Sequence, residues 1–106
     1  MSIGPNSLGF VTVASAGTPV QLVSSAMRVR CFRVQPRKNA TTVNVGNVYI
    51  GGSNLNVSTK TGIYAILSPE QTEGIEIRYP QDLTDISQWY VDADNSNDSV
   101  LVGVTA

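Results

Sequence analysis

Short apolar runs, each closed by turn-forming residues, constrain the fold of this chain more than any other feature of its sequence. Most of the runs alternate apolar with polar residues, as a strand with one buried face does. No stretch of ten or more residues carries an apolar stripe at helical spacing. We therefore predict an all-β protein with about eight short strands, over residues 8–13, 19–23, 27–35, 41–50, 63–67, 73–79, 88–93 and 99–104.

The strand spacing also predicts how these strands are arranged. Many short strands separated by turns favour a single antiparallel β-sandwich, jelly-roll-like, or a small barrel. The length of 106 residues suits one domain with one core, which we place at residues 8–106. Residues 1–7 are mostly polar and contain Gly and Pro, so they are either a flexible N-terminal arm or a frayed terminus.

Local irregularities in the pattern predict bends and turns. The apolar phase of the third run switches at Phe32–Arg33, which a β-bulge would explain. A second switch at Gly46–Asn47 indicates either a two-residue hairpin turn or another bulge. The string Gly51–Asn54 is a strong turn signal, and residues 82–87 could form a single helical turn.

The residue types that usually perform catalysis are scarce. There is no histidine, which removes the commonest general base and metal ligand. The single cysteine, Cys31, lies in an apolar-patterned run and is expected to be buried and inert. Lys38 and Lys60 lie in polar turns, and Glu73 and Glu76 differ in strand parity, so neither pair suggests a reactive site. We predict no catalytic residue, no cofactor and no metal site.

One polar loop has a partial resemblance to a metal-binding sequence. Residues 92–98 carry oxygen ligands at alternate positions, as the start of a calcium loop does. The sixth position is Asn97 instead of Gly, and the twelfth is Gly103 instead of Glu. A polar hairpin loop whose Asx side chains cap their own backbone explains the same residues.

Charge is sparse and unevenly distributed along the chain. Charged residues make up 14% of the sequence, the formal net charge is −1, and every acidic residue lies in 70–98. Five of the seven basic residues cluster at Arg28, Arg30, Arg33, Arg37 and Lys38. The two groups either interleave on a mixed surface or form a basic side and an acidic side that can join copies or dock on a lattice. The slightly acidic total disfavours nucleic-acid binding.

The sequence shows neither a membrane span nor a signal peptide. No run of about eighteen apolar residues is present. The N-terminal residues lack the basic start and the apolar stretch of a signal peptide, so we expect synthesis in the cytoplasm of the producing cell.

Five short motifs occur in an order that resembles small virion proteins of tailed bacteriophages. They are Thr18–Leu22 (TPVQL), Gly46–Ser53 (GNVYIGGS), Leu67–Glu70 (LSPE), Asp82–Ile86 (DLTDI) and Tyr90–Asp94 (YVDAD). The resemblance extends over roughly residues 10–102, and none of its motifs is catalytic. The chain departs from the pattern after the LSP string, where Glu-Gln stands in place of Gly-Glu.

This resemblance implies a structural role. Such proteins are similar to capsid decoration (cement) proteins and to head-fibre or tail-associated β modules. The implied function is to bind the outer surface of the head as a homo-oligomer, taken here as a trimer, and to stabilise the shell. The implied partners are the major capsid protein or other virion proteins, and the implied location is the virion. We predict that the protein-contact residues include Arg28, Arg30, Arg33, Arg37, Lys38, Tyr49 and Tyr90.

Two other functions stay open. A receptor- or glycan-binding module on a tail or fibre would need solvent-exposed aromatic side chains, for which Tyr49, Tyr64, Tyr79 and Tyr90 are the candidates. An enzyme would need a pair of cooperating carboxylates that the strand pattern does not display.

Overall fold

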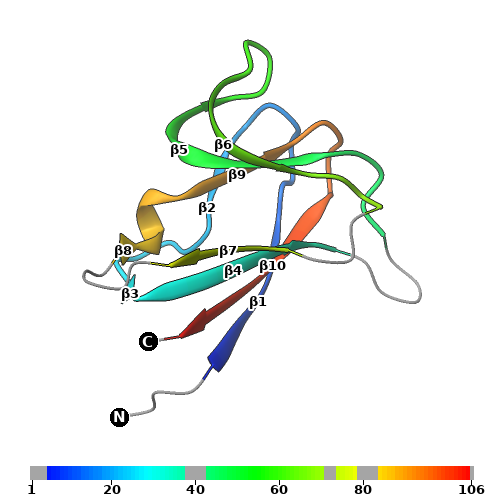
Figure 1. The fold of residues 1–106 in the computed structure, drawn as a ribbon. Coiled ribbons are helices and arrows are strands. Elements are labelled where there is room, and N and C mark those ends of the chain that lie inside the picture. The colour runs from blue at the N-terminus through cyan, green and yellow to red at the C-terminus, as the bar shows by residue number, and fades with distance from the viewer. Residues whose placement is uncertain (1–4, 38–42, 71–73, 79–83, 106) are drawn as a thin grey trace.

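Antiparallel sheets make up the computed structural model, which describes residues 5–37, 43–70, 74–78 and 84–105 (Figure 1). Sheet A has the strand order β1 (Pro5–Thr12), β10 (Ser99–Thr105), β4 (Cys31–Pro36) and β7 (Ile75–Arg78). Sheet B has the order β2 (Val20–Gln21), β9 (Tyr90–Ala93), β5 (Val48–Asn56) and β6 (Thr61–Leu67). A small sheet C joins β3 (Arg28–Val29) to β8 (Thr84–Asp85). The all-β prediction is confirmed, and the alternative of a closed barrel is wrong.

The strands of sheets A and B are paired in a nested way. Apart from β3 and β8, the described residues form eight strands, and the first pairs with the last, β1 with β10. The second pairs with the seventh, the third with the sixth and the fourth with the fifth, as β2 with β9, β4 with β7 and β5 with β6. The chain thus resembles one long hairpin whose two arms are folded over together.

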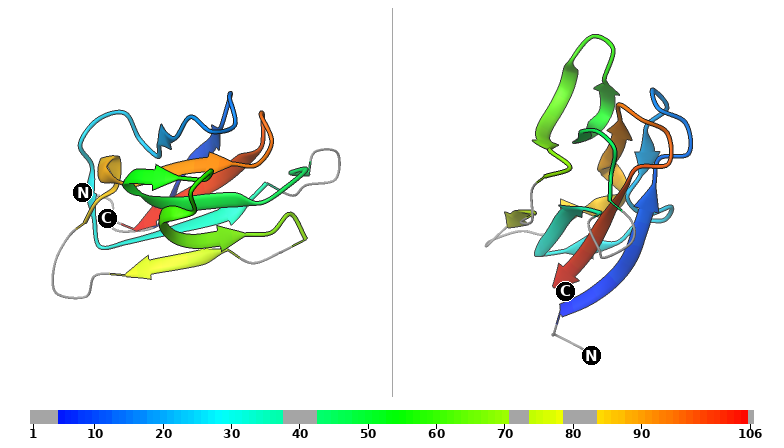
Figure 2. Two further views of the ribbon diagram at one scale, coloured as in Figure 1. Left: turned by 90° about the horizontal axis from the view of Figure 1, so that it is seen from above. Right: turned by 90° about the vertical axis from the view of Figure 1, so that its right-hand side faces the viewer.

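One hydrophobic core lies between the two larger sheets, which form separate layers (Figures 1 and 2). Val100, Val102 and Val104 of β10 are buried, as the alternation predicts, and they pack with Phe32 and Val34 of β4. Each buried side chain of this kind stabilises the fold by about 1.5–3 kcal/mol. Ile77 of β7 and Val29 of β3 are also buried, and sheet B and the connecting segments supply the remaining members, namely Val13, Leu22, Val48, Ile50, Leu67, Ile86, Val91 and Ala93.

The third run of the sequence crosses from one sheet to another. The expected bulge at Phe32–Arg33 is wrong, because the chain bends at Arg30, between β3 and β4. Before the bend, β3 pairs with β8, and after it β4 pairs with β10 and β7. This change of sheet, instead of an inserted residue, reverses the apolar phase. Cys31 is consequently half-buried on the face of sheet A opposite to Phe32.

The Gly-rich string Gly51–Asn54 does not form a turn, so that prediction is wrong. It lies within β5, and the chain reverses instead at residues 57–60. A side chain at Gly51 would collide with the carbonyl oxygen of Gly62 on β6. The glycines therefore permit a close approach of two strands, which is the other physical reason for glycine inside a strand.

Three smaller expectations are also revised. Gly46–Asn47 is neither a hairpin turn nor a bulge, but a bend that precedes β5. Of the residues 82–87 expected to form a helical turn, 82 and 83 lie outside the described part, 84 and 85 form β8, and 86 and 87 belong to a 3-10 turn, η1 (Ile86–Gln88). Pro5–Ser7, expected in an N-terminal arm, pair with Gly103–Thr105, while residues 1–4 lie outside the described part. The described chain has ten strands where eight were expected, because the run 27–35 divides into β3 and β4 and the short strand β8 was not expected.

Candidate interaction face

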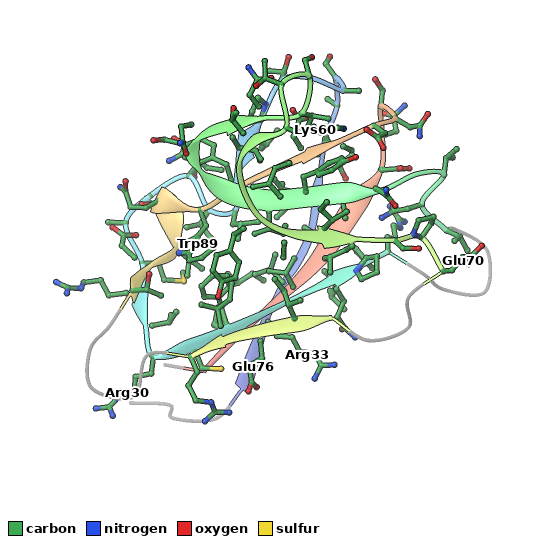
Figure 3. The ribbon with its side chains drawn as sticks, turned by 45° about the horizontal axis from the view of Figure 1, so that its top comes forward. Arg30, Arg33, Lys60, Glu70, Glu76 and Trp89 are labelled. Carbon is green, nitrogen blue, oxygen red and sulfur yellow. The ribbon has the colours of Figure 1, made fainter. Side chains whose placement is uncertain are left out.

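The side of sheet A that faces away from sheet B is the strongest candidate for a functional surface. Residues on this outer face alternate along each strand with the buried core residues. Figure 3 shows Arg30, Arg33 and Glu76 extending on this side of the molecule, whereas Lys60 lies on the opposite side. The described residues that we assign to the outer face are Phe10, Cys31, Arg33, Gln35, Arg37, Glu76, Arg78, Leu101 and Gly103.

An arginine–aromatic contact lies at one end of the outer face. Phe10 of β1 is 47% exposed. The guanidinium carbon of Arg37, just after β4, lies 4.6 Å from the centre of the Phe10 ring. A guanidinium over an aromatic face is held there by cation–π attraction. The backbone of Arg37 is fixed as well, since its N–H donates to the carbonyl of Ser99 at 3.1 Å and its carbonyl accepts from Asn44 N–H at 3.0 Å.

The centre of the outer face carries a row of opposite charges. Gly103, Arg33 and Glu76 are neighbours across β10, β4 and β7. Arg78 Nη2 donates to Glu76 Oε2 at 2.7 Å. The hydrogen bond and the charge of Arg78 lower the pKa of Glu76, and the charge of Arg33 adds a smaller effect. The charge of Glu76 is thus balanced mainly by Arg78, and the outer face keeps a net positive charge.

The charge of the outer face can be counted against that of the whole chain. The face carries three positive charges, on Arg33, Arg37 and Arg78, and one negative charge, on Glu76, so its net charge is +2. Because the whole chain has a net charge of −1, the other residues together carry −3. Elsewhere the two signs interleave, as in sheet C, where Arg28 lies opposite Asp85. The surface combines the two arrangements that the sequence left open: mixed charges at sheet C and a positive excess on one sheet face.

The structure separates the other predicted contact residues. Arg30 is exposed at the bend beside the outer face, and Lys38 lies outside the described residues. Tyr49 is 3% exposed, and its hydroxyl donates to Asp94 Oδ2 at 2.9 Å, which argues against a contact role for its ring. Tyr90 is half-buried on β9, in sheet B. The described arginines of the predicted set therefore lie on or near sheet A or in sheet C: Arg28, Arg30, Arg33 and Arg37. The two tyrosines are separate from them, in sheet B.

Cys31 also lies on the outer face, where it was not expected. Burial raises the pKa of its thiol, the charge of Glu76 raises it further, and Arg78 opposes the shift. A raised pKa leaves less of the nucleophilic thiolate at neutral pH. The expectation of an inert thiol therefore keeps its physical basis, although the side chain is half-buried instead of fully buried.

The acidic loop at residues 92–98 ties neighbouring segments together. Asp92 is fully buried, and its Oδ1 accepts from Gly17 N–H at 3.0 Å and from Ala93 N–H at 2.8 Å. Asp98 accepts from Val45 N–H and Gly46 N–H, each at 2.9 Å. Only Asp92 caps a backbone group next to itself, so the loop mainly anchors other segments. Within the described ranges, no three His, Cys, Asp or Glu side chains are grouped to hold a metal ion.

An aromatic cluster lies at the edge of sheet B. Trp89 packs edge-on against Phe32 and against Tyr64, with ring centres 5.1 Å apart in each pair. Tyr64 is 63% exposed, and it lies where the register between β5 and β6 shifts. Among the four tyrosines considered for glycan binding, Tyr64 is the exposed one in the described chain, and Tyr79 lies outside it.

Sequence reasoning missed several members of the outer face, namely Phe10, Leu101 and Arg78. Alternation along β10 places Leu101 opposite to the buried valines, so this residue could have been assigned. Phe10 could not, because its partners depend on the pairing of β1 with β10, which joins the two ends of the chain.

The comparisons with known proteins do not extend this description. None of the described helical residues forms a segment long and apolar enough to cross a membrane. No protein-family model, no curated protein and no solved structure matches the chain.

Proposed function

We propose that the chain is a phage virion structural protein, a non-enzymatic decoration protein that binds the outer surface of the head and stabilises the shell. The nested pairing of eight strands over one core supports an antiparallel β-sandwich of jelly-roll type. Double-sheet jelly rolls are common in viral capsid domains and in lectins. The fold alone does not assign a function, so the proposal depends on the properties of the surface.

The composition of the outer face of sheet A is the main support for the docking role. It combines an exposed aromatic ring, Phe10, with Arg33 and Arg37 on a sheet whose other side is held by the core. Aromatic residues and arginine are enriched at protein interfaces and supply most of their hot spots. A rigid sheet also loses little conformational entropy on binding.

The proposed role needs only modest affinity at each contact. A homo-oligomer, taken as a trimer, engages a symmetric shell at several points at once, and this multiplies the strength of individual contacts. The partners would be the major capsid protein or other virion proteins.

The position of the protein in purified particles tests this proposal. Immunogold or fusion-tag labelling followed by electron microscopy should show copies in the hundreds, spread over the head. A handful of copies at the tail, or none on the particle, would contradict the decoration role. The count separates decoration from a tail-associated module directly.

Exposed Tyr64 supports a second candidate function, a tail- or fibre-associated receptor- or glycan-binding module. Its ring is supported by Trp89, whose Nε1 donates to Thr84 Oγ1 at 3.3 Å. A glycan array probed with the wild-type protein and with Tyr64→Ala tests this function. A signal lost on that substitution would favour the glycan reading over decoration, and an array without any signal would count against it.

A further inference from the structure

We propose that the outer face of sheet A binds carboxylate groups of an acidic protein partner, and that Arg37, stacked on Phe10, is the main contact. This inference rests on the docking role proposed above, but it does not depend on the partner being a capsid protein. It names the chemistry that the partner must present: aspartate or glutamate side chains on a surface that can lie against a sheet.

Arg37 is arranged to receive a carboxylate. Its backbone is fixed by the bonds to Ser99 and Asn44, and its guanidinium carbon lies 4.6 Å from the centre of the Phe10 ring. The Nε atom is buried and has no hydrogen-bond partner. The residue as a whole is half-buried, so part of its side chain stays open to a partner. A planar guanidinium binds a carboxylate through two parallel hydrogen bonds, and a fixed side chain loses little entropy in doing so.

The charges around Arg37 favour an acidic partner. Glu76 is paired with Arg78 at 2.7 Å, so Arg33 and Arg37 stay as the cations of the face that form no ion pair within the described ranges. If a second copy docked through the same face, two surfaces that each carry a net charge of +2 would meet. The repulsion between them disfavours that arrangement. A nucleic acid presents a continuous line of phosphates, and a whole chain with a net charge of −1 disfavours such a partner. Protein carboxylates are the anions that the observations favour.

Nuclear magnetic resonance titration of the whole labelled protein with hexaglutamate at low salt tests the inference. The amide shifts should change along β1, β4 and β10, and the binding should weaken as salt is added. Arg37→Gln should weaken binding by about tenfold or more, because a charge-assisted hydrogen-bonded pair is lost. Arg37→Lys should lose most of that affinity although it keeps the charge, because lysine has no planar fork.

Two variants control for simple charge attraction and for the stacking. Arg30→Gln removes the same charge from an exposed bend beside the face, and it should cost less than about threefold in affinity. Phe10→Leu keeps an apolar side chain but removes the ring. It should weaken binding more than Arg30→Gln does and less than Arg37→Gln does. Thermal melts of each variant confirm that the fold is retained.

The outcomes separate this inference from the proposed function. Equal losses for Arg30→Gln and Arg37→Gln, or unchanged binding by Arg37→Lys, would mean unspecific attraction and would overturn the inference. Tighter binding of a thymidine hexanucleotide than of hexaglutamate would assign the face to nucleic acid and overturn it as well. A protein found on phage heads that fails the hexaglutamate test keeps its proposed function. One that passes the test but is absent from virions keeps the carboxylate site.

Discussion

Replacing Asp98 with alanine should release the segment before β5 and destabilise the whole fold. The side chain is 4% exposed and accepts two backbone hydrogen bonds, from Val45 N–H and Gly46 N–H at 2.9 Å each. A hydrogen bond to a charged group contributes about 1.5–3 kcal/mol. Val45 is 76% exposed, so water can reach part of this segment, and we take the lower limit for each bond. The expected loss is therefore about 3 kcal/mol in the free energy of unfolding.

Urea denaturation of the wild type, Asp98→Ala and Asp98→Asn measures this loss at constant m-value. Asparagine keeps one acceptor oxygen but points an amino group at the second N–H. Asp98→Asn should therefore lower the free energy of unfolding by an intermediate amount, about 2 kcal/mol. A loss below about 0.5 kcal/mol for alanine, the size of an ordinary surface substitution, would refute the anchoring role. A rise in melting temperature with added calcium that Asp92→Asn abolishes would show that the loop is an ion site instead.

Two further predictions test the strand contacts and the charges. Gly51→Ala should destabilise the protein by about 1–3 kcal/mol, because the new methyl group meets the carbonyl of Gly62, whereas Gly52→Ala should be nearly neutral; equal losses in urea would contradict the close approach. The pKa of Asp85 is lowered, first by the hydrogen bond from Met27 N–H, so its contribution to stability is present above the ordinary value of 3.8 and is lost as pH falls through the folded-state value. Asp85→Asn should therefore lose less stability than the wild type between about pH 5 and about pH 3, and parallel curves would contradict this.

The regular strands followed from the sequence because their two faces meet different surroundings. Val100, Val102 and Val104 were expected on one face of a strand, and all three are buried. The turn expected at Gly51–Asn54 failed because glycine is favoured both in turns and where two backbones approach closely. Choosing between the two requires knowledge that the carbonyl of Gly62 lies close against Gly51, which no local pattern contains.

The candidate face was only partly visible in the sequence for a similar reason. Alternation separates Arg33 from the buried Phe32 and Val34, so its exposure could be expected. The contact between Arg37 and Phe10 could not, because it joins β4 to a strand near the start of the chain through β10.

Tyr49 shows the opposite failure, since a residue expected at the surface is covered. Its place in β5, between the buried Val48 and Ile50, puts it on the side of sheet B away from the core. Lys60, from the turn after β5, lies over the ring with its Nζ 4.8 Å from the ring centre. A strand pattern indicates which face a side chain is on, but it does not show that a neighbouring turn folds over that face.

The orientation of the protein on a phage particle tests the central claim most directly. A cryo-electron microscopy map of decorated heads, at a resolution that places the strands, would show which side of the domain meets the shell. We predict that the outer face of sheet A, with Phe10, Arg33 and Arg37, lies against acidic side chains of the capsid protein. A map in which this face is turned to solvent, with sheet B or the β6 edge on the shell, would contradict the account.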